Sequence, residues 1–277
     1  CSCEAGPGFD VEEALWSLLD KQLIHRAEGA TGVMRFAILE TLREFGLAEL
    51  RRTDELLTAQ RAMATHYVAL AEQVGRHLNG PDSARHHAFL SRESNNLNVA
   101  IAWIDANHDT ELALCLSAEL LPFANQQPRS VERIAASAVR LAAAYPNSAR
   151  LADSYLTAGY SSAILGKREE ARRYLRKTIE MDEAIGHKAH PEYIGVAYGM
   201  LAWDAFDRGD YEIALSYFDR DLAQGRASGN QWRLAMTLMH IGILQGRLGN
   251  FTVAEQRIAE SMRMHQRLGD IWAIAKI

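Results

Sequence analysis

Gly209-Asp210-Tyr211-Glu212-Ile213-Ala214 is one of three related phrases in this chain of 277 residues. The other two are Gly166-Lys167-Arg168-Glu169-Glu170-Ala171 and Gly249-Asn250-Phe251-Thr252-Val253-Ala254, and all three share a Gly-x-x-x-x-Ala pattern. Their glycines are 43 and 40 residues apart, and a second glycine series, Gly186, Gly229 and Gly269, has the same two spacings. Two markers that keep one period indicate an internal repeat. Repeats of this length usually stack into a helical solenoid that binds partners.

Each repeat is predicted to be a pair of helices joined at the Gly-x-x-x-x-Ala phrase. One position of the first helix holds small residues and one position of the second holds large apolar residues: Gly159, Ala202 and Gly242 against Leu175, Phe218 and Ile258. A small residue that faces a large one lets two helices approach closely. With only six prolines in the chain, we expect an all-α, right-handed helical-hairpin solenoid.

The composition excludes several classes of protein. A formal net charge of −5 offers no general attraction for a nucleic-acid backbone. No apolar run is long enough for a membrane span. The three cysteines, Cys1, Cys3 and Cys115, are too few and too badly spaced for a disulfide framework or a zinc site. We therefore expect a cytoplasmic protein with no membrane and no direct nucleic-acid partner. The start at Cys1 and the end at Ile277 inside a helical pattern indicate a piece of a longer protein.

The first 54 residues are predicted to form a helix, a β-hairpin and a second helix. The helix is expected over residues 10–20, the hairpin strands over 23–26 and 33–38 around a loop at 28–32, and the next helix over 40–50. This order resembles the last part of a winged-helix domain. Its recognition helix would contain Glu12, Glu13 and Asp20, which would repel phosphate, so a packing role is favoured over DNA binding.

Residues 55–109 are predicted to form a helical linker. A long helix over 55–78 is stopped by Asn79-Gly80-Pro81, and residues 93–96 interrupt the apolar pattern before it resumes at 97–103. Residues 110–150 are predicted to form a degenerate first repeat, with helices over 110–124 and 131–145. The repeats proper occupy 151–277, about three in number, the last one cut.

The repeat positions resemble the tetratricopeptide repeat. Gly209, Tyr211, Ala214 and Phe218 match its pattern, as do Gly249, Phe251, Ala254 and Ile258; the first unit keeps Gly166 and Ala171 but has Arg168 in place of the aromatic residue. The period of 40–43 residues implies longer helices than usual for that family. The resemblance covers residues 150–277.

A second resemblance concerns the parent protein. Residues 35–45 (RFAILETLREF) and 93–103 (ESNNLNVAIAW) resemble phrases in large bacterial STAND or NB-ARC-like ATPase regulators, often of LuxR type. In these proteins a nucleotide-switch ATPase precedes a winged helix, a helical linker and tetratricopeptide repeats. The chain departs from them at Ile38-Leu39-Glu40, where NB-ARC proteins have Met-His-Asp, and it has no Gly-x-x-x-x-Gly-Lys-[Ser/Thr] phosphate loop. The resemblance thus implies that ATP or ADP binds a missing N-terminal part, while this chain has no cofactor and is no enzyme.

Large residues on the inner side of the repeats are the candidate ligand site. By the repeat frame, a concave groove would be lined by Leu156, Tyr160, Gly199, Trp203, Phe206, Asp207, Met239, Ile243 and Arg247. Aromatic and Met side chains supply contact area, and Asp207 and Arg247 would orient a polar ligand. The alternative, that Trp203 and Phe206 only pack between neighbouring repeats, is equally open.

Other chemistry-bearing residues are interpreted as structural. His187 and His190 lack a third metal ligand, and His86 and His87 point to different faces of one helix. Cys115 lies in an apolar helix and is expected in the core. The basic stretch Lys167-Arg168, Arg172-Arg173 and Arg176-Lys177 is interleaved with Glu169, Glu170 and Glu180, which favours a solvated helix face over phosphate binding.

The leading functional hypothesis is a non-catalytic sensor arm of a STAND-type transcriptional regulator. Its repeats would bind an effector protein, a peptide or a small inducer, and would act on the chain's own ATPase domain and on homo-oligomerisation. The rival is a free-standing tetratricopeptide scaffold or adaptor. An enzyme ranks third, because no acid–base or metal cluster is visible.

Overall fold

The structure is a computed structural model that describes residues 10–27, 35–75, 83–187 and 191–268. It divides into two compact units, residues 1–67 and 68–277. The first unit contains α1 (Val11–Asp20), β1 (Ile24–Ala27), β2 (Arg35–Ile38) and α2 (Glu40–Arg52). Helix α3 (Leu56–Gly75) starts in the first unit and ends in the second. No described helix has both the length and the hydropathy needed to cross a bilayer.

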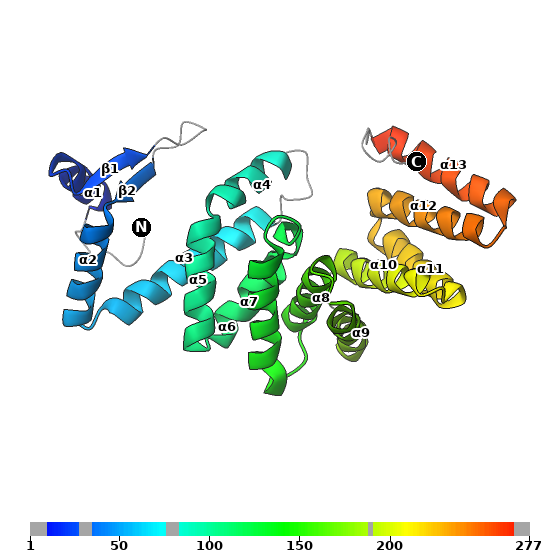
Figure 1. The fold of residues 1–277 in the computed structure, drawn as a ribbon, viewed down its shortest axis with the longest axis horizontal. Coiled ribbons are helices and arrows are strands. Elements are labelled where there is room, and N and C mark those ends of the chain that lie inside the picture. The colour runs from blue at the N-terminus through cyan, green and yellow to red at the C-terminus, as the bar shows by residue number, and fades with distance from the viewer. Residues whose placement is uncertain (1–9, 28–34, 76–82, 188–190, 269–277) are drawn as a thin grey trace. The chain divides into compact units, whose positions relative to one another are not determined.

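The helix, hairpin and helix predicted for the first unit are present (Figure 1). The carboxylate of Asp10 caps α1 by accepting the backbone N–H groups of Glu12 and Glu13, at 2.9 and 3.1 Å. Strands β1 and β2 pair antiparallel, with Ile24 opposite Ile38. The predicted hairpin loop at 28–32 lies outside the described residues. The assignment of these elements to a winged helix stays a prediction.

The second unit is helical throughout its described residues. Before the repeats come α4 (Ser83–Arg92), α5 (Ser94–Asn107), α6 (Thr110–Glu119), the 3₁₀ turn η1 (Leu121–Phe123), α7 (Pro128–Leu141) and the 3₁₀ turn η2 (Ala142–Ala144). The predicted break at 93–96 is shorter than expected, since α5 already begins at Ser94. Helix α7 begins three residues earlier than predicted, because Pro128 occupies the first turn, where a missing N–H costs nothing.

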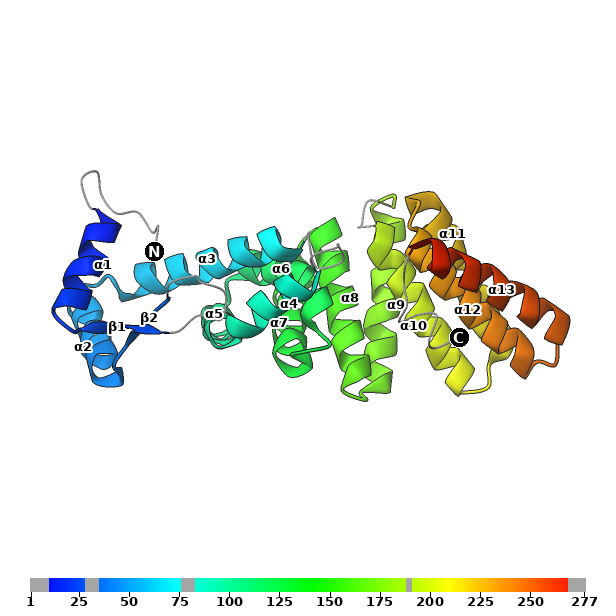
Figure 2. The same cartoon turned by 90° about the horizontal axis from the view of Figure 1, so that it is seen from above.

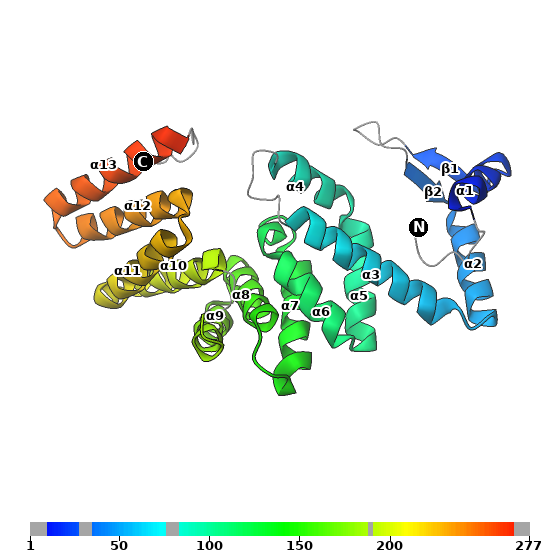
Figure 3. The ribbon, with the colours of Figure 1, turned by 180° about the vertical axis from the view of Figure 1, so that it is seen from behind.

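The repeats form three helical hairpins. Their helices are α8 (Ala149–Ile164), α9 (Arg168–Ala184), α10 (Pro191–Asp207), α11 (Tyr211–Ser228), α12 (Gln231–Arg247) and α13 (Phe251–Leu268). Within each hairpin the two helices pack side by side, and α9 packs on α10 as α11 does on α12. Figures 1 and 2 show this succession from two directions, and Figure 3 shows α6 and α7 packed before α8, the first helix of the repeats. The predicted helical-hairpin repeat is confirmed.

The periodic glycines end the first helix of each hairpin. Gly166, Gly209 and Gly249 adopt φ values of +76°, +81° and +80°. This left-handed conformation strains residues that carry a Cβ. In the middle repeat the N–H of Gly209 donates to the carbonyl of Phe206, and the next N–H donates to that of Ala205, both at 2.9 Å. The spacing of these glycines therefore marks where each helix must stop.

The small-against-large packing predicted from the repeat is also confirmed. A Cβ placed on Gly159 would lie 2.8 Å from Cγ of Leu175, and one placed on Gly242 would lie 2.6 Å from Cγ1 of Ile258. In the middle repeat, Ala202 packs in the same core as Phe218, which is completely buried. In each hairpin, one position of the first helix therefore has room only for glycine or alanine.

We expect Gly242→Ala to lower the free energy of unfolding by about 1–3 kcal/mol, the usual cost of overpacking. Rotation of Ile258 alone cannot relieve the clash, because the new Cβ would also lie 3.2 Å from the carbonyl oxygen of Ala254 and 3.3 Å from the backbone nitrogen of Ile258. The matched control is Gly246→Ala, one turn later, where the Cβ meets only Cβ of Ala254 at 3.7 Å. It should be neutral or stabilising by up to about 1 kcal/mol. Urea unfolding of both variants measures the difference, and equal effects would contradict this packing.

The aromatic position after the glycine behaves differently in each repeat. Tyr211 packs against Phe206, with ring centroids 5.6 Å apart. In the first repeat Arg168 forms an ion pair with Asp207 of the next repeat at 3.1 Å. In the third, Phe251 is 69% exposed, because the residue equivalent to Phe206 is Gly246, which has no side chain to contact it. Tyr211 thus has an aromatic partner within its repeat, whereas Phe251 is mostly exposed.

Candidate ligand pocket between α9 and α10

The nine predicted groove residues occupy three rows along the first helices of the repeats. The first row, Leu156, Gly199 and Met239, is buried. Leu156 belongs to a core shared with Leu175 of α9. A Cβ on Gly199 would lie 2.8 Å from Nη2 of Arg233. The prediction that this row lines an open groove is therefore wrong, because neighbouring helices cover the N-terminal half of each first helix.

The other groove residues remain accessible: the second row is Tyr160, Trp203 and Ile243, and the third is Asp207 and Arg247, with Phe206 beside Asp207. Tyr160 and Trp203 are half-buried, Ile243 is 38% exposed, and Asp207 and Arg247 are exposed. The hydroxyl of Tyr160 accepts a hydrogen bond from the side-chain amide of Asn125 at 3.1 Å, which ties it to the preceding helix pair. The accessible predicted residues therefore lie toward the C-terminal ends of α8, α10 and α12.

Trp203 and Phe206 contact each other, as the alternative reading, packing, expected. Their ring centroids are 5.2 Å apart in an edge-to-face arrangement. Trp203 also contacts Phe218 of its own hairpin at 5.8 Å and His240 of the next hairpin at 4.8 Å. Such pairs stabilise packing beyond the area they bury. Trp203 is thus an inter-repeat packing residue, and it also borders a cavity.

The cavity has a volume of about 200 Å³ and lies among α8, α9 and α10. Its walls combine apolar and charged side chains: Ala163, Ala171, Leu175, Met200 and Trp203 with Arg168, Arg172, Asp204 and Asp207. Two of the predicted groove residues, Trp203 and Asp207, line it. The volume is below the usual range for a drug-sized ligand, so it suits one side chain or a small polar group.

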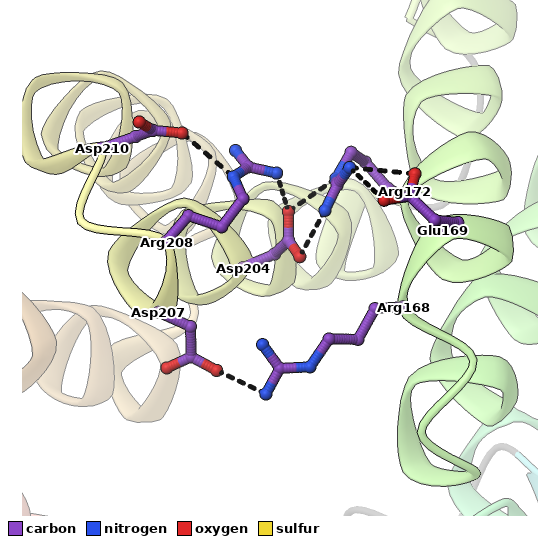
Figure 4. A network of polar contacts seen from close by, with 7 residues as sticks. All are labelled: Arg168, Glu169, Arg172, Asp204, Asp207, Arg208 and Asp210. Carbon is purple, nitrogen blue, oxygen red and sulfur yellow. Dashed lines mark hydrogen bonds and ion pairs between the residues drawn. The ribbon is translucent and has the colours of Figure 1, made fainter.

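An ion-pair network forms the charged wall of this pocket (Figure 4). Arg172 donates from Nε and Nη2 to the two oxygens of Asp204, at 2.8 and 3.1 Å. Arg208 also donates to Asp204, at 2.7 Å, and to Asp210, at 2.9 Å. Bidentate pairs of this kind are strong and directional. Since Arg172 is on α9 and Asp204 on α10, the network joins successive repeats.

The network has a largely buried inner pair, Arg172–Asp204, and an exposed outer pair, Arg168–Asp207. The side chains of Arg172 and Asp204 are 16% and 17% exposed. Those of Arg168 and Asp207 are 64% and 47% exposed, and an exposed pair of this kind contributes at most about 1 kcal/mol. Arg168 and Asp207 are therefore the groups that a charged ligand can engage at little cost.

The charges of the inner pair do not change near neutral pH. Burial acts to raise the pKa of Asp204, but hydrogen bonds from Arg172 and the charges of Arg172, Arg208 and Arg168 outweigh it, so the pKa lies below its usual value. The hydrogen bond to Asp204 in turn raises the pKa of Arg172. The pocket thus presents a permanent pattern of charge.

The ring of His240 packs against that of Trp203 and is neutral at physiological pH. Burial, together with the positive charge of Arg233, lowers its pKa to about 4. Its ring also packs against Phe218, with centroids 5.6 Å apart. The imidazole therefore serves as an aromatic packing residue between α10 and α12.

A buried ion pair that the sequence does not predict lies beside the first row. Arg233 of α12 donates from Nε to Asp221 of α11 at 2.7 Å, and the hydroxyl of Thr237 donates to the other oxygen of Asp221 at 2.8 Å. Arg233 also donates to the carbonyl of Gly195. Burial raises the pKa of Asp221, while Arg233 and Thr237 act against the rise. Gly195 and Gly199, four residues apart on α10, are the sequence signal of a close approach here, although they do not identify the partner.

The rejected metal and thiol candidates are consistent with structural roles. His187 pairs with Asp182, with Nδ1 and Oδ2 3.0 Å apart, while His190 lies outside the described residues. His86 is described, whereas the side chain of His87 is not. No group of three His, Cys, Asp or Glu residues within the described ranges is arranged to hold a metal ion. Cys115 is buried as predicted, and burial raises the pKa of its thiol, which disfavours the reactive thiolate.

Comparison with known proteins supports the fold. No protein-family model and no curated protein matches the sequence. Among solved structures, the apo form of RapI and aspartyl phosphate phosphatase F from Bacillus subtilis each match with a TM-score of 0.54 and 16% identity, over 86% and 94% of this chain. A signal transduction ATPase with numerous domains (STAND) from Pyrococcus horikoshii, which has a tetratricopeptide repeat sensor, matches with a TM-score of 0.51 and 15% identity over 95% of this chain.

The chain is shorter than these structures. It spans 62% of each of the first two and 47% of the third. At such low identity the matches show the fold alone: the chain is similar to helical-repeat proteins of the tetratricopeptide type.

Proposed function

We propose that this chain is a non-catalytic sensor arm of a larger signal-transduction ATPase that regulates transcription. The observation that carries the proposal is the pocket itself: Trp203 and the exposed pair Arg168–Asp207 meet where one repeat packs on the next. A ligand held there contacts α9 and α10 together, so it favours one packing of the two repeats over another. Such a difference in affinity is what couples binding to a distant response.

The similarity to a STAND protein with a tetratricopeptide repeat sensor supports this proposal. Nearly all of this chain corresponds to about half of that structure, which leaves room for an ATPase elsewhere in a parent protein. ATP or ADP would bind that part, and the elements of the first unit would act as the winged helix that couples the repeats to it. Effector binding would then control nucleotide-dependent oligomerisation.

The pocket indicates the chemistry of the effector. Arg168 offers a cation for a carboxylate, Asp207 offers an anion for an amine, and Trp203 with Met200 provides apolar contact. A peptide, a protein segment or a small inducer with an apolar group beside a charge fits this combination. A free-standing repeat scaffold would use the same pocket, and the matches to RapI and the B. subtilis phosphatase keep that second candidate open.

A thermal-shift screen with short peptides and amino-acid derivatives tests the pocket. A bound compound at 100 times its Kd stabilises the protein by about 2.7 kcal/mol, a shift of roughly 5–10 °C in Tm. We expect Arg168→Glu to remove most of that shift, because the new carboxylate would repel both the carboxylate of the ligand and Asp207. The charge-matched control is Arg51→Glu on α2, which leaves the pocket unchanged. Compounds that stabilise the wild type and Arg168→Glu equally would show that this pocket is not their site.

A further inference from the structure

A second cleft lies along another face of α9. Six charged residues follow the spacing of one helix face: Glu169, Arg172, Arg173, Arg176, Lys177 and Glu180. They line a cavity of about 620 Å³ together with Ala136, Val139 and Arg140 of α7, Tyr155 of α8 and Tyr174 of α9. This cleft is separate from the pocket between α9 and α10, although Arg172 borders both.

The cleft is basic in a chain that is acidic overall. It has five cationic side chains and two carboxylates, whereas the chain has a formal net charge of −5. Some of the cations are paired: Arg172 with Glu169 and Asp204, Lys177 with Glu180 at 3.2 Å, and Arg140 with Asp105 at 3.1 Å. Carboxylates on α5, α9 and α10 therefore account for these three cations.

Arg173 and Arg176 are not explained in this way. Among the described residues no carboxylate lies within ion-pair distance of either side chain, and both residues are exposed. The guanidinium of Arg173 lies over the ring of Tyr174, with 5.0 Å to the ring centroid. This contact holds one cation against an aromatic surface while leaving its N–H groups available to a further acceptor.

The dimensions of the cleft favour a short extended peptide. The charged face runs from residue 169 to residue 180, about 16 Å along the helix axis, which an extended strand covers with about five residues. Tyr155, Tyr174 and Val139 add apolar surface to the wall. The carboxylates of Glu169 and Glu180 stand at the two ends of the face, where Arg172 and Lys177 pair with them.

We propose that the cleft between α7 and α9 docks an acidic segment of a partner protein, about five residues long, with an aromatic or aliphatic side chain beside Tyr155 and Tyr174. Its carboxylates complement Arg173 and Arg176, and its apolar group accounts for the tyrosines. This docking surface goes beyond the effector pocket, because it lies on a different pair of helices and favours an acidic segment, whereas the effector pocket offers exposed charges of both signs.

Fluorescence anisotropy with a fluorescein-labelled pentapeptide, four acidic residues around a central phenylalanine, tests the proposal. We expect saturable binding that weakens with added salt, as exposed charge pairs do. The variant Arg173→Glu/Arg176→Glu should bind about tenfold more weakly or worse, because two attractions become repulsions. Both residues are exposed, so circular dichroism should show an unchanged fold. The control Arg51→Glu/Arg267→Glu changes the net charge equally and should lose no more than about twofold.

Three outcomes would overturn the docking site: no saturable binding of the peptide to the wild type, an equal loss in both double variants, or tighter binding of a single-stranded oligonucleotide that the Arg173→Glu/Arg176→Glu variant also loses. Arg168→Glu separates this proposal from the effector pocket. It should leave pentapeptide binding within about twofold of wild type while removing the thermal shift of the effector compounds.

Discussion

Replacing Asp221 by alanine is expected to destabilise the protein by about 3–5 kcal/mol, the usual effect of removing one partner from a buried ion pair. Asp221 is almost completely buried, and the side chain of its partner Arg233 is 16% exposed. The variant leaves the guanidinium of Arg233 without its carboxylate and takes an acceptor from Thr237. An unpaired charge in this position cannot recover its hydration without opening the helices around it.

The position of this pair explains why its loss should be felt beyond one hairpin. Asp221 belongs to α11, Arg233 and Thr237 to α12, and the carbonyl of Gly195 that accepts from Arg233 belongs to α10. Since stacked repeats are stabilised by contacts with their neighbours, the pair contributes to the interface between the second and third hairpins as well as to its own helices.

Thermal and urea unfolding followed by circular dichroism measure the loss, which corresponds to a decrease of roughly 6–15 °C in Tm. The control is Asp219→Ala, an exposed aspartate two residues earlier on α11, which should change stability by no more than about 0.5 kcal/mol. If both variants had the same small effect, Asp221 and Arg233 would not form a buried pair in solution.

The second large effect is a loss of stability at mildly acidic pH through His240. Its pKa is about 4 in the folded protein, against an ordinary value of 6.5, because the half-buried ring is desolvated beside Trp203 and Phe218, with Arg233 nearby. The unfolded chain therefore binds a proton that the folded chain rejects. The contribution of neutral His240 is fully present above about pH 6.5, declines as the pH falls, and is lost by about pH 4, a total of about 3 kcal/mol.

Urea unfolding at several pH values between 7.5 and 4, compared with the variant His240→Leu, isolates this contribution. The carboxylates and the other histidines titrate in both proteins, so they cancel in the difference. The wild type should lose up to about 3 kcal/mol more than His240→Leu across this range. Parallel pH profiles for the two proteins would contradict the burial of a neutral imidazole at this position.

Periodic local features of this protein could be predicted from its sequence. Gly166, Gly209 and Gly249 mark the helix ends because a left-handed backbone is cheap only for glycine, and this requirement is local. Gly159 and Gly242 identify the close helix contacts for the same kind of reason, since space for a side chain is either present or absent. Of the nine predicted groove residues, Trp203 and Asp207 line the cavity.

What only the tertiary structure decided is which side chains meet. Arg168 reads as a departure from the repeat pattern, yet it pairs with Asp207 from the next hairpin. Gly199 reads as part of a groove, yet Arg233 of α12 covers it. The basic run on α9 lines a cleft only because residues of α7 and α8 supply the rest of its wall. The physical reason is that helix boundaries follow from backbone preferences encoded residue by residue, whereas ion pairs and cavities depend on where separate helices cross and on the rotamers they impose.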